Sequence, residues 1–252
     1  MTKRLMLAAV AALALTAGAA VSAPAAAADE VIAKAVADPA RPEADVARDA
    51  ERKPAEMMAF AEVHPGEVVA DFLPGGGYFT RIFSKAVGAD GKVFAVISEA
   101  QANGDKPPAV AGIAADPAYG NVQVVAAQFE SLSLPQKADL IWTSQNYHDL
   151  HLSRLHLDVA KVNKAVFDSL KPGGLYVVLD HAAAPGSPIT SADELHRIDP
   201  AIVKREVEAA GFVFVGEDDA LRNPADEHTL KVFDPVIRGH TDQFIYKFKK
   251  PE

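Results

Sequence analysis

The feature that most constrains the fold of this chain is a glycine cluster between an apolar run and an amphipathic segment. Residues 68–73 are mostly apolar and predict a buried strand. A Pro-Gly-Gly-Gly cluster follows at residues 74–77, and a helix is expected at about residues 78–87. Glycine allows a tight turn there and lets a ligand approach main-chain N–H groups. In open α/β sheets such a turn lies at the carboxyl ends of the strands, where ligands bind.

Strands and helices alternate along the rest of the chain. Three further helices are expected, at about residues 54–63, 155–170 and 200–210, and the second ends at a Lys-Pro-Gly-Gly stop. Six further strands are expected at residues 92–97, 122–126, 140–143, 175–179, 212–215 and 244–248. Alternation predicts a mostly parallel sheet covered on both faces. The last two strands have no helix between them, so an antiparallel edge is expected.

The first residues have the layout of a secretory signal peptide. Lys3 and Arg4 precede an uncharged run at residues 5–21, and small residues continue to Ala28. We expect residues 1–28 to be a signal peptide cleaved near Pro24 or Asp29, which leaves no stable membrane anchor. The protein would then be periplasmic or secreted. Residues 29–53 are expected to form a loosely attached arm with a short helix, and residues 54–252 the main domain.

Composition narrows the classes of function. Hydrophobic residues make up 49% of the chain, enough for the core of one α/β domain. The chain has no cysteine, which excludes disulfides, thiolate metal sites and a cysteine nucleophile. The net charge of −9 argues against a nucleic-acid partner, because phosphate binding needs clustered Lys and Arg. A small-molecule substrate is expected; the sequence does not indicate the oligomeric state.

Four motifs in a fixed order resemble those of the class I S-adenosylmethionine (SAM)-dependent methyltransferases. They are Asp71 with its glycine turn, Gly-Lys-Val-Phe-Ala-Val at residues 91–96, Asp-Leu-Ile-Trp at residues 139–142 and Leu-Lys-Pro-Gly-Gly-Leu at residues 170–175. Residues 209–212 and 248–251 resemble the last two strands of that family. The resemblance covers roughly residues 54–251. It implies a Rossmann-like, seven-stranded α/β sheet that is mostly parallel, with an antiparallel last strand and helices on both faces, and SAM-dependent methyl transfer as the activity.

The resemblance also implies cofactor contacts at the glycine turn. Asp71 matches the acidic residue that ends the first strand and helps to orient the amino-acid end of SAM. Gly75 and Gly77 match two glycines of the loop. Leu73 stands where the family has its first loop glycine, and this side chain crowds the turn.

Two further contacts differ from the family pattern. The acid that usually grips the ribose hydroxyls is replaced by Ile97, and Glu99 is expected to substitute for it. Gln128 occupies the position beside the adenine, where an amide oxygen can still accept a hydrogen bond from the amino group. Displaced acids also favour an alternative, a non-catalytic periplasmic binding protein that keeps the fold with a degenerate cofactor site. A nicotinamide-dependent oxidoreductase is disfavoured, since Thr80 stands at the third glycine of that pattern.

Candidate acceptor-site residues follow the fourth and fifth strands. Methyl transfer needs an aligned acceptor atom and removal of its proton. His148 or His181 is expected to act as the base, with Asp149 or Asp180 orienting the ring. The alternative is that these residues form only a polar rim.

A metal site is not expected in this region. His148, His151 and His156 invite that interpretation, but the spacing of the last two suits no helical ligand pair, and the HExxH motif is absent. His196 precedes Asp199, which is expected to cap the helix that follows it. The long polar segment before the last strand is of the kind that often carries function, and Arg52, Arg222 and Arg238 are candidate contacts for an anionic group.

Overall fold

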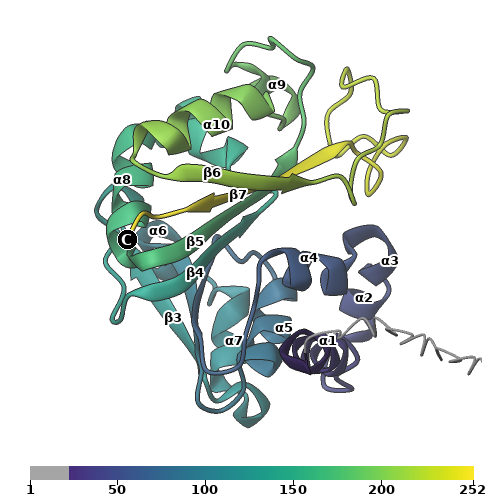
Figure 1. Cartoon of the computed structure of the whole chain (residues 1–252). Coiled ribbons are helices and arrows are strands. Elements are labelled where there is room, and N and C mark those ends of the chain that lie inside the picture. The colour runs from purple at the N-terminus through teal and green to yellow at the C-terminus, as the bar shows by residue number, and fades with distance from the viewer. Residues whose placement is uncertain (1–22) are drawn as a thin grey trace, which may run out of the picture.

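Seven strands form one sheet in the computed structural model, which describes residues 23–252 (Figure 1). The strand order is β3-β2-β1-β4-β5-β7-β6; β7 pairs antiparallel with β5 and β6, and all other pairs are parallel. The predicted fold class is therefore confirmed. The strands are β1 (Val68–Phe72), β2 (Lys92–Ser98), β3 (Val122–Ala127), β4 (Ala138–Ser144), β5 (Leu170–His181), β6 (Val213–Asp218) and β7 (Gln243–Lys249).

Helices cover both faces of the sheet. Apolar side chains of α1 (Ala23–Val36), α4 (Pro54–Phe60), α5 (Tyr78–Val87) and α7 (Ala109–Ala115) pack into one core cluster. Those of α8 (Val159–Ser169) and α10 (Pro200–Ala209) pack into a second cluster on the opposite face. Short helices complete the chain: α2 (Glu43–Val46), α3 (Asp49–Arg52), α6 (Glu99–Ala102) and α9 (Ser191–Leu195).

The central strand β1 shows why its residues form a buried parallel strand. All five of its residues are buried. Val69 belongs to the core on the α5 side, while Ala70 and Phe72 belong to the core on the α8 side. Because helices cover both faces of the sheet, side chains that point to either face are apolar, which is typical of parallel strands. Asp71 is the exception, and it lies where the strand meets the glycine loop.

Most observed helix boundaries agree with those predicted from the sequence, and the clearest difference is at the start of one helix. The helix predicted at residues 78–87 is confirmed as α5, and the Asp199 side chain caps α10 as predicted, accepting a hydrogen bond from the Ala201 N–H at 2.9 Å. The helix predicted to begin near Leu155 begins instead at Val159. Asp158 is its N-cap, accepting from the Lys161 N–H at 3.3 Å, and the residues before it form short 3-10 turns.

The N-terminal arm is firmly packed, unlike the loose attachment expected for it. Ile32 and Ala35 of α1 are only 5% and 2% exposed in the core beside α5. Arg41 donates to both carboxylate oxygens of Asp49, at 2.6 and 2.9 Å, and Asp49 accepts from the Tyr78 hydroxyl. These polar contacts tie the arm to the start of α5.

The predicted signal peptide lies largely outside the residues that the structure describes. Both proposed cleavage points, near Pro24 and Asp29, precede Ile32 and Ala35, so the packed part of the arm stays in the mature chain under either choice. No helix within residues 23–252 combines the length and the apolar character needed to cross a bilayer.

Candidate functional site

The glycine loop after β1 forms an open cradle. Leu73, Gly75 and Gly77 all have positive φ, at 61°, 55° and 77°. A Cβ added to Gly77 would lie 2.1 Å from Ile113 Cδ1, so a larger residue there would have to displace the Ile113 side chain of α7 and adopt a left-handed backbone. A Cβ at Gly75 or Gly76 would meet no atom within 4 Å. Among the described residues, the N–H groups of Gly75 and Gly76 make no hydrogen bond, so both can donate to a ligand.

Asp71 lies buried beneath this loop. Its carboxylate accepts a hydrogen bond from the Thr80 hydroxyl at 2.6 Å, which joins the end of β1 to the first turn of α5. Burial raises the pKa of Asp71 to about 6, although Thr80 and the nearby charge of Arg52 act in the opposite direction. Asp71, predicted to orient the cofactor loop, therefore fixes the loop by bonding to Thr80 in the helix that follows it.

A cavity of about 180 Å³ lies between the glycine loop and the N-terminal arm. Arg52, at the end of α3, reaches into it and donates to the Ser144 hydroxyl at 2.9 Å. The guanidinium lies over the rings of Tyr78 and Phe79, 4.5 and 4.8 Å from their centres. Burial and repulsion from Arg48 lower the pKa of Arg52 to about 10. No carboxylate of the described residues lies within 4.0 Å of Arg52, so this cation is available to an anionic ligand.

A larger cavity of about 660 Å³ lies on the other side of Leu73. Leu73 lines both cavities. Glu99 and Gln128 face the larger one, where the Gln128 amide donates to the Glu99 carboxylate at 3.1 Å. Ile97 is 3% exposed and packs in the core, so Glu99 is the acidic residue that β2 brings to the cavity. Apolar lining comes from Phe129, Leu150, Leu155 and Leu157, and the charged residues Glu130, Asp149 and Arg154 also line the cavity.

His148 is held by Asp180 at the carboxyl ends of β4 and β5. Its ring Nδ1 lies 2.8 Å from Asp180 Oδ1, and its backbone N–H donates to the other oxygen of the same carboxylate. Burial acts to lower the pKa of His148, but the negative charge of Asp180 outweighs it, and the pKa is raised above its usual value. The same interaction keeps the pKa of the fully buried Asp180 low. Asp180 thus orients the ring, and His148 Nε2 faces away from it.

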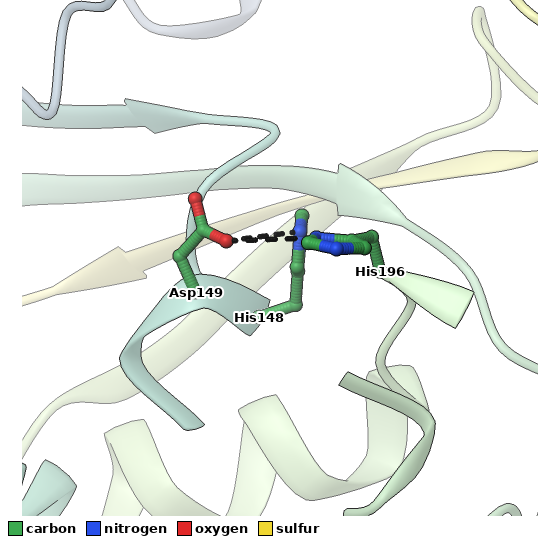
Figure 2. A group of neighbouring side chains, drawn as sticks. All are labelled: His148, Asp149 and His196. Carbon is green, nitrogen blue, oxygen red and sulfur yellow. Dashed lines mark ion pairs between the residues drawn. The ribbon is translucent and has the colours of Figure 1, made fainter. Parts of the chain in front are cut away.

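Asp149 and His196 lie on the free side of the His148 ring (Figure 2). His148 Nε2 is 3.4 Å from Asp149 Oδ1, and His196 Nδ1 is 3.8 Å from the same oxygen. Burial, mainly, raises the pKa of Asp149 and lowers that of His196. Asp149 also lines the larger cavity, so this cluster borders the volume that Glu99 and Gln128 face.

His181 lies beside the cluster in a different environment. Its ring centre is 6.0 Å from that of His148, and its Nδ1 lies 2.7 Å from the Thr241 hydroxyl. Burial lowers the pKa of His181 to about 4, so the ring is neutral at physiological pH. His151 lies elsewhere, paired with Glu206 at 3.0 Å, and His156 is exposed.

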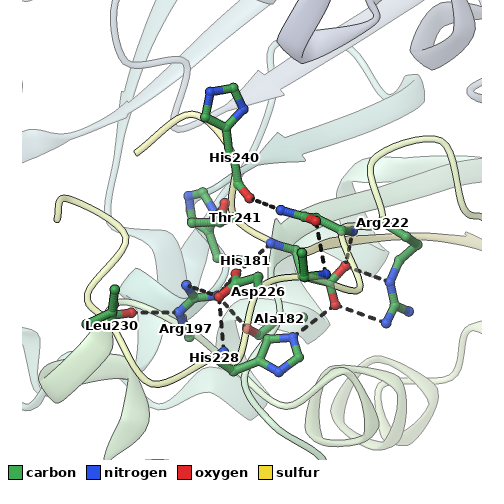
Figure 3. Close-up of polar contacts among 12 residues, drawn as sticks. His181, Ala182, Arg197, Arg222, Asp226, His228, Leu230, His240 and Thr241 are labelled. Carbon is green, nitrogen blue, oxygen red and sulfur yellow. Dashed lines mark hydrogen bonds and ion pairs between the residues drawn. The ribbon is translucent and has the colours of Figure 1, made fainter. Parts of the chain in front are cut away.

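The polar segment between β6 and β7 is anchored by two ion pairs, of which the Arg197–Asp226 pair is buried (Figure 3). Arg197 donates to Asp226 and to the carbonyl oxygens of Ala182 and Leu230. Arg222 pairs with Asp242 at 2.8 Å. Arg222 is therefore paired with Asp242 inside the segment between β6 and β7. Arg52, another candidate contact for an anionic group, lies at the glycine loop instead.

The sequence pointed to most of these residues but not to His196. The six expected cofactor contacts all lie at the glycine loop or line the larger cavity, and His148 and Asp149 border it. His196 was considered only as a neighbour of a helix cap. Its signal was weak, because nothing in its local sequence indicates that the end of α9 meets the turn that follows β4.

Comparisons with known proteins agree with this architecture. No family model matches the chain. The chain is similar to the ubiquinone/menaquinone biosynthesis C-methyltransferase of Cronobacter sakazakii, with 29% identity over 67% of this chain and 64% of that protein. Among solved structures, a SAM-dependent methyltransferase from Aquifex aeolicus aligns with a TM-score of 0.56 and 17% identity, covering 88% of this chain and 97% of that one. A putative sarcosine dimethylglycine methyltransferase from Galdieria sulphuraria aligns with a TM-score of 0.58 and 17% identity, over 80% and 85%.

The sheet order, the glycine loop and these similarities define the class. The chain has the fold of the class I SAM-dependent methyltransferase superfamily, and the resemblance noted from its motifs is confirmed at that level. It spans 64% of the length of its curated relative. Fold alone does not establish a reaction, so the activity must be argued from the site.

Proposed function

We propose that this protein is a SAM-dependent methyltransferase acting on a small or amphiphilic acceptor. One observation carries the proposal: the unpaired cation Arg52 and the acidic Glu99 lie in cavities on opposite sides of Leu73. SAM has a carboxylate at one end, which suits a cation such as Arg52. It has ribose hydroxyls and an adenine at the other end, which suit an acceptor such as Glu99. The curated relative, named as a C-methyltransferase, supports methyl transfer as the reaction class.

The residues present suit the cofactor at both ends. Arg52 and the free N–H groups of Gly75 and Gly76 would hold the carboxylate, while Asp71 keeps the loop in place. Glu99 would accept from the ribose hydroxyls, and Gln128 with Phe129 would border the adenine. Bound SAM supplies a methyl group on a positively charged sulfur.

The protein's own contribution to the reaction is positioning and proton removal. Asp180 accepts the Nδ1 proton of His148, which leaves the Nε2 lone pair free on the side of Asp149. His148 Nε2 is thus placed to accept a proton from an acceptor near Asp149. His181 is neutral and bonded to Thr241, and its proposed part is to pack beside His148.

Calorimetric titration of SAM and S-adenosylhomocysteine into the purified protein tests this function. We expect micromolar binding, weakened at least tenfold in Arg52→Met and in Glu99→Gln, with partial recovery in Arg52→Lys. Arg205→Met, an exposed site on α10, is the matched control and should bind like the wild type. Absence of heat and of thermal stabilisation at millimolar ligand would rule out the methyltransferase assignment.

A specific observation favours a second candidate, a non-catalytic binding protein with a degenerate cofactor site. Glu99 already accepts a hydrogen bond from Gln128, and the Leu73 side chain, which stands where the family has a glycine, lines both cavities. A protein of this kind would bind an amphiphilic ligand in the larger cavity and ignore SAM. The same titration separates the two functions.

The proposed site of action is the periplasm or the exterior. The layout of residues 1–28 supports export. Fractionation of producing cells and N-terminal sequencing test it: the mature protein should begin near Pro24 or Asp29. An uncleaved chain recovered from the cytoplasm would contradict this location without affecting the titration.

A further inference from the structure

Three side chains at the edge of the larger cavity have the spacing of metal ligands (Figure 2). The ligand atoms of His148, Asp149 and His196 all lie within 4.8 Å of one another. Bonds of about 2.1 Å to a tetrahedral zinc ion place neighbouring ligand atoms about 3.4 Å apart. The His148–Asp149 separation of 3.4 Å equals this value, and the His196–Asp149 separation of 3.8 Å is close to it.

The contact between His148 and Asp180 is a second, independent indication. Histidines that bind metals almost always donate their other ring N–H to a carboxylate or carbonyl, which fixes the tautomer and the ring orientation. His148 does this through Nδ1, 2.8 Å from the fully buried Asp180. The remaining nitrogen, Nε2, therefore presents its lone pair to Asp149 and His196.

His196 is brought to the cluster by the fold. It ends α9 with a φ of 54°, and its ring lies edge-on to both His148 and Phe233, with ring centres 5.4 and 4.8 Å away. His148 and Asp149 come from the 3-10 turn His148–His151 after β4. Asp149 lines the larger cavity, so a cation held by these three side chains would have its remaining position on that side.

We propose that His148 Nε2, Asp149 and His196 Nδ1 bind one divalent transition-metal ion, with a position left open to an oxygen atom of the methyl acceptor. Two imidazoles and a carboxylate suit zinc, cobalt or iron better than magnesium or calcium. The assignment of the open position rests on the proposed function, whereas metal binding does not.

The ion changes how the acceptor loses its proton. In the metal-loaded protein His148 Nε2 is a ligand and accepts no proton. A phenol or enol hydroxyl coordinated to the cation loses its proton to solvent more readily, because the positive charge stabilises the oxyanion. The methyl acceptor class is therefore a hydroxylated or enolic molecule.

Metal binding is measured on the purified protein, without a histidine tag, by zinc titration against a chromophoric chelator and by the visible spectrum after cobalt(II) loading. We expect one equivalent of zinc and a cobalt spectrum typical of low coordination number. His196→Asn should weaken zinc binding at least tenfold, and Asp149→Asn similarly. His156→Asn is the matched control, because His156 also has a left-handed backbone, with φ of 52°, but is exposed and outside the cluster.

Asp180→Asn tests the positioning role and should weaken zinc binding by about 10–100-fold. Acetohydroxamate, a small oxygen-donor chelator, should change the cobalt spectrum if a position is open; an unchanged spectrum contradicts the open position. Zinc affinity that is equal in the wild type and His196→Asn, or an absence of stoichiometric zinc, overturns the metal site. SAM titration of the same samples separates these failures from failure of the proposed function.

Discussion

At the scale of single residues, the glycines of the loop serve two different purposes: one allows close packing against a helix, and two leave space for a ligand. Gly77 has a left-handed backbone and an added Cβ would meet the Ile113 side chain of α7, while Gly75 and Gly76 face open space. Leu73 takes a left-handed backbone, which costs roughly 1 kcal/mol for a residue with a Cβ. Its side chain lines both cavities, so this strained residue marks the boundary between the two halves of the site.

Two alanine substitutions distinguish the glycine needed for folding stability from the glycine needed for SAM binding. Gly77→Ala should destabilise the fold by about 2–4 kcal/mol, since its Cβ would overlap Ile113 and its φ is 77°. Gly76→Ala should change stability by less than about 0.5 kcal/mol, as no atom lies within 4 Å of the new Cβ, yet weaken SAM binding at least tenfold. Urea unfolding and calorimetry measure both effects. Equal stability losses would contradict the distinction.

At the scale of elements, the segment between β6 and β7 is long but firmly attached. Arg197 is 0% exposed and bonds to Asp226, while the Arg222 side chain is 47% exposed beside Asp242. The Val232 N–H also donates to the carbonyl of Leu195 in α9, next to His196. The loop therefore supports the element that carries His196.

Removing each arginine should have very different costs. Arg197→Met leaves Asp226 buried without its cation, and breaking a buried pair costs about 3–5 kcal/mol. Arg222→Met removes a half-exposed partner and should cost at most about 1 kcal/mol. Urea unfolding at neutral pH compares the two variants. Similar losses would mean that burial of the pair does not set its contribution.

The elements also show what the sequence can and cannot predict. β1 and α5 were predictable because a change of hydrophobic period coincides with a glycine cluster. The packing of the arm was not, because Ile32 and Ala35 give only a faint apolar stripe in an Ala-rich segment. The meeting of His148 and Asp180 at one sheet edge follows from parallel β4 and β5, in which Ser144 pairs with Leu179. Which carboxylate orients the ring depends on the 3-10 turn, and no local pattern specifies it.

At the scale of the whole molecule, two buried groups oppose each other in their effect on pH-dependent stability. The folded pKa of Asp71, about 6, lies above its value of 3.8 in an unfolded chain. The folded protein therefore holds the extra proton, and stability falls as pH rises from about 4 to 6. The folded pKa of His181, about 4, lies below its unfolded value of 6.5. The unfolded chain then holds the extra proton, and stability rises over nearly the same range.

Single substitutions should reveal how the free energy of unfolding depends on pH through each of the two groups. Shifts of about two units correspond to about 3 kcal/mol each, so in the wild type the two contributions nearly cancel between about pH 4 and 6. Asp71→Asn should make stability rise with pH through His181, while His181→Gln should make it fall through Asp71. The double variant should return to a pH dependence like that of the wild type, because two opposite slopes are removed together and every other titrating group is retained. Urea unfolding at half-unit steps of pH measures the slopes, and parallel profiles for the wild type and Asp71→Asn would show that the buried Asp71 carboxyl does not take up a proton on folding.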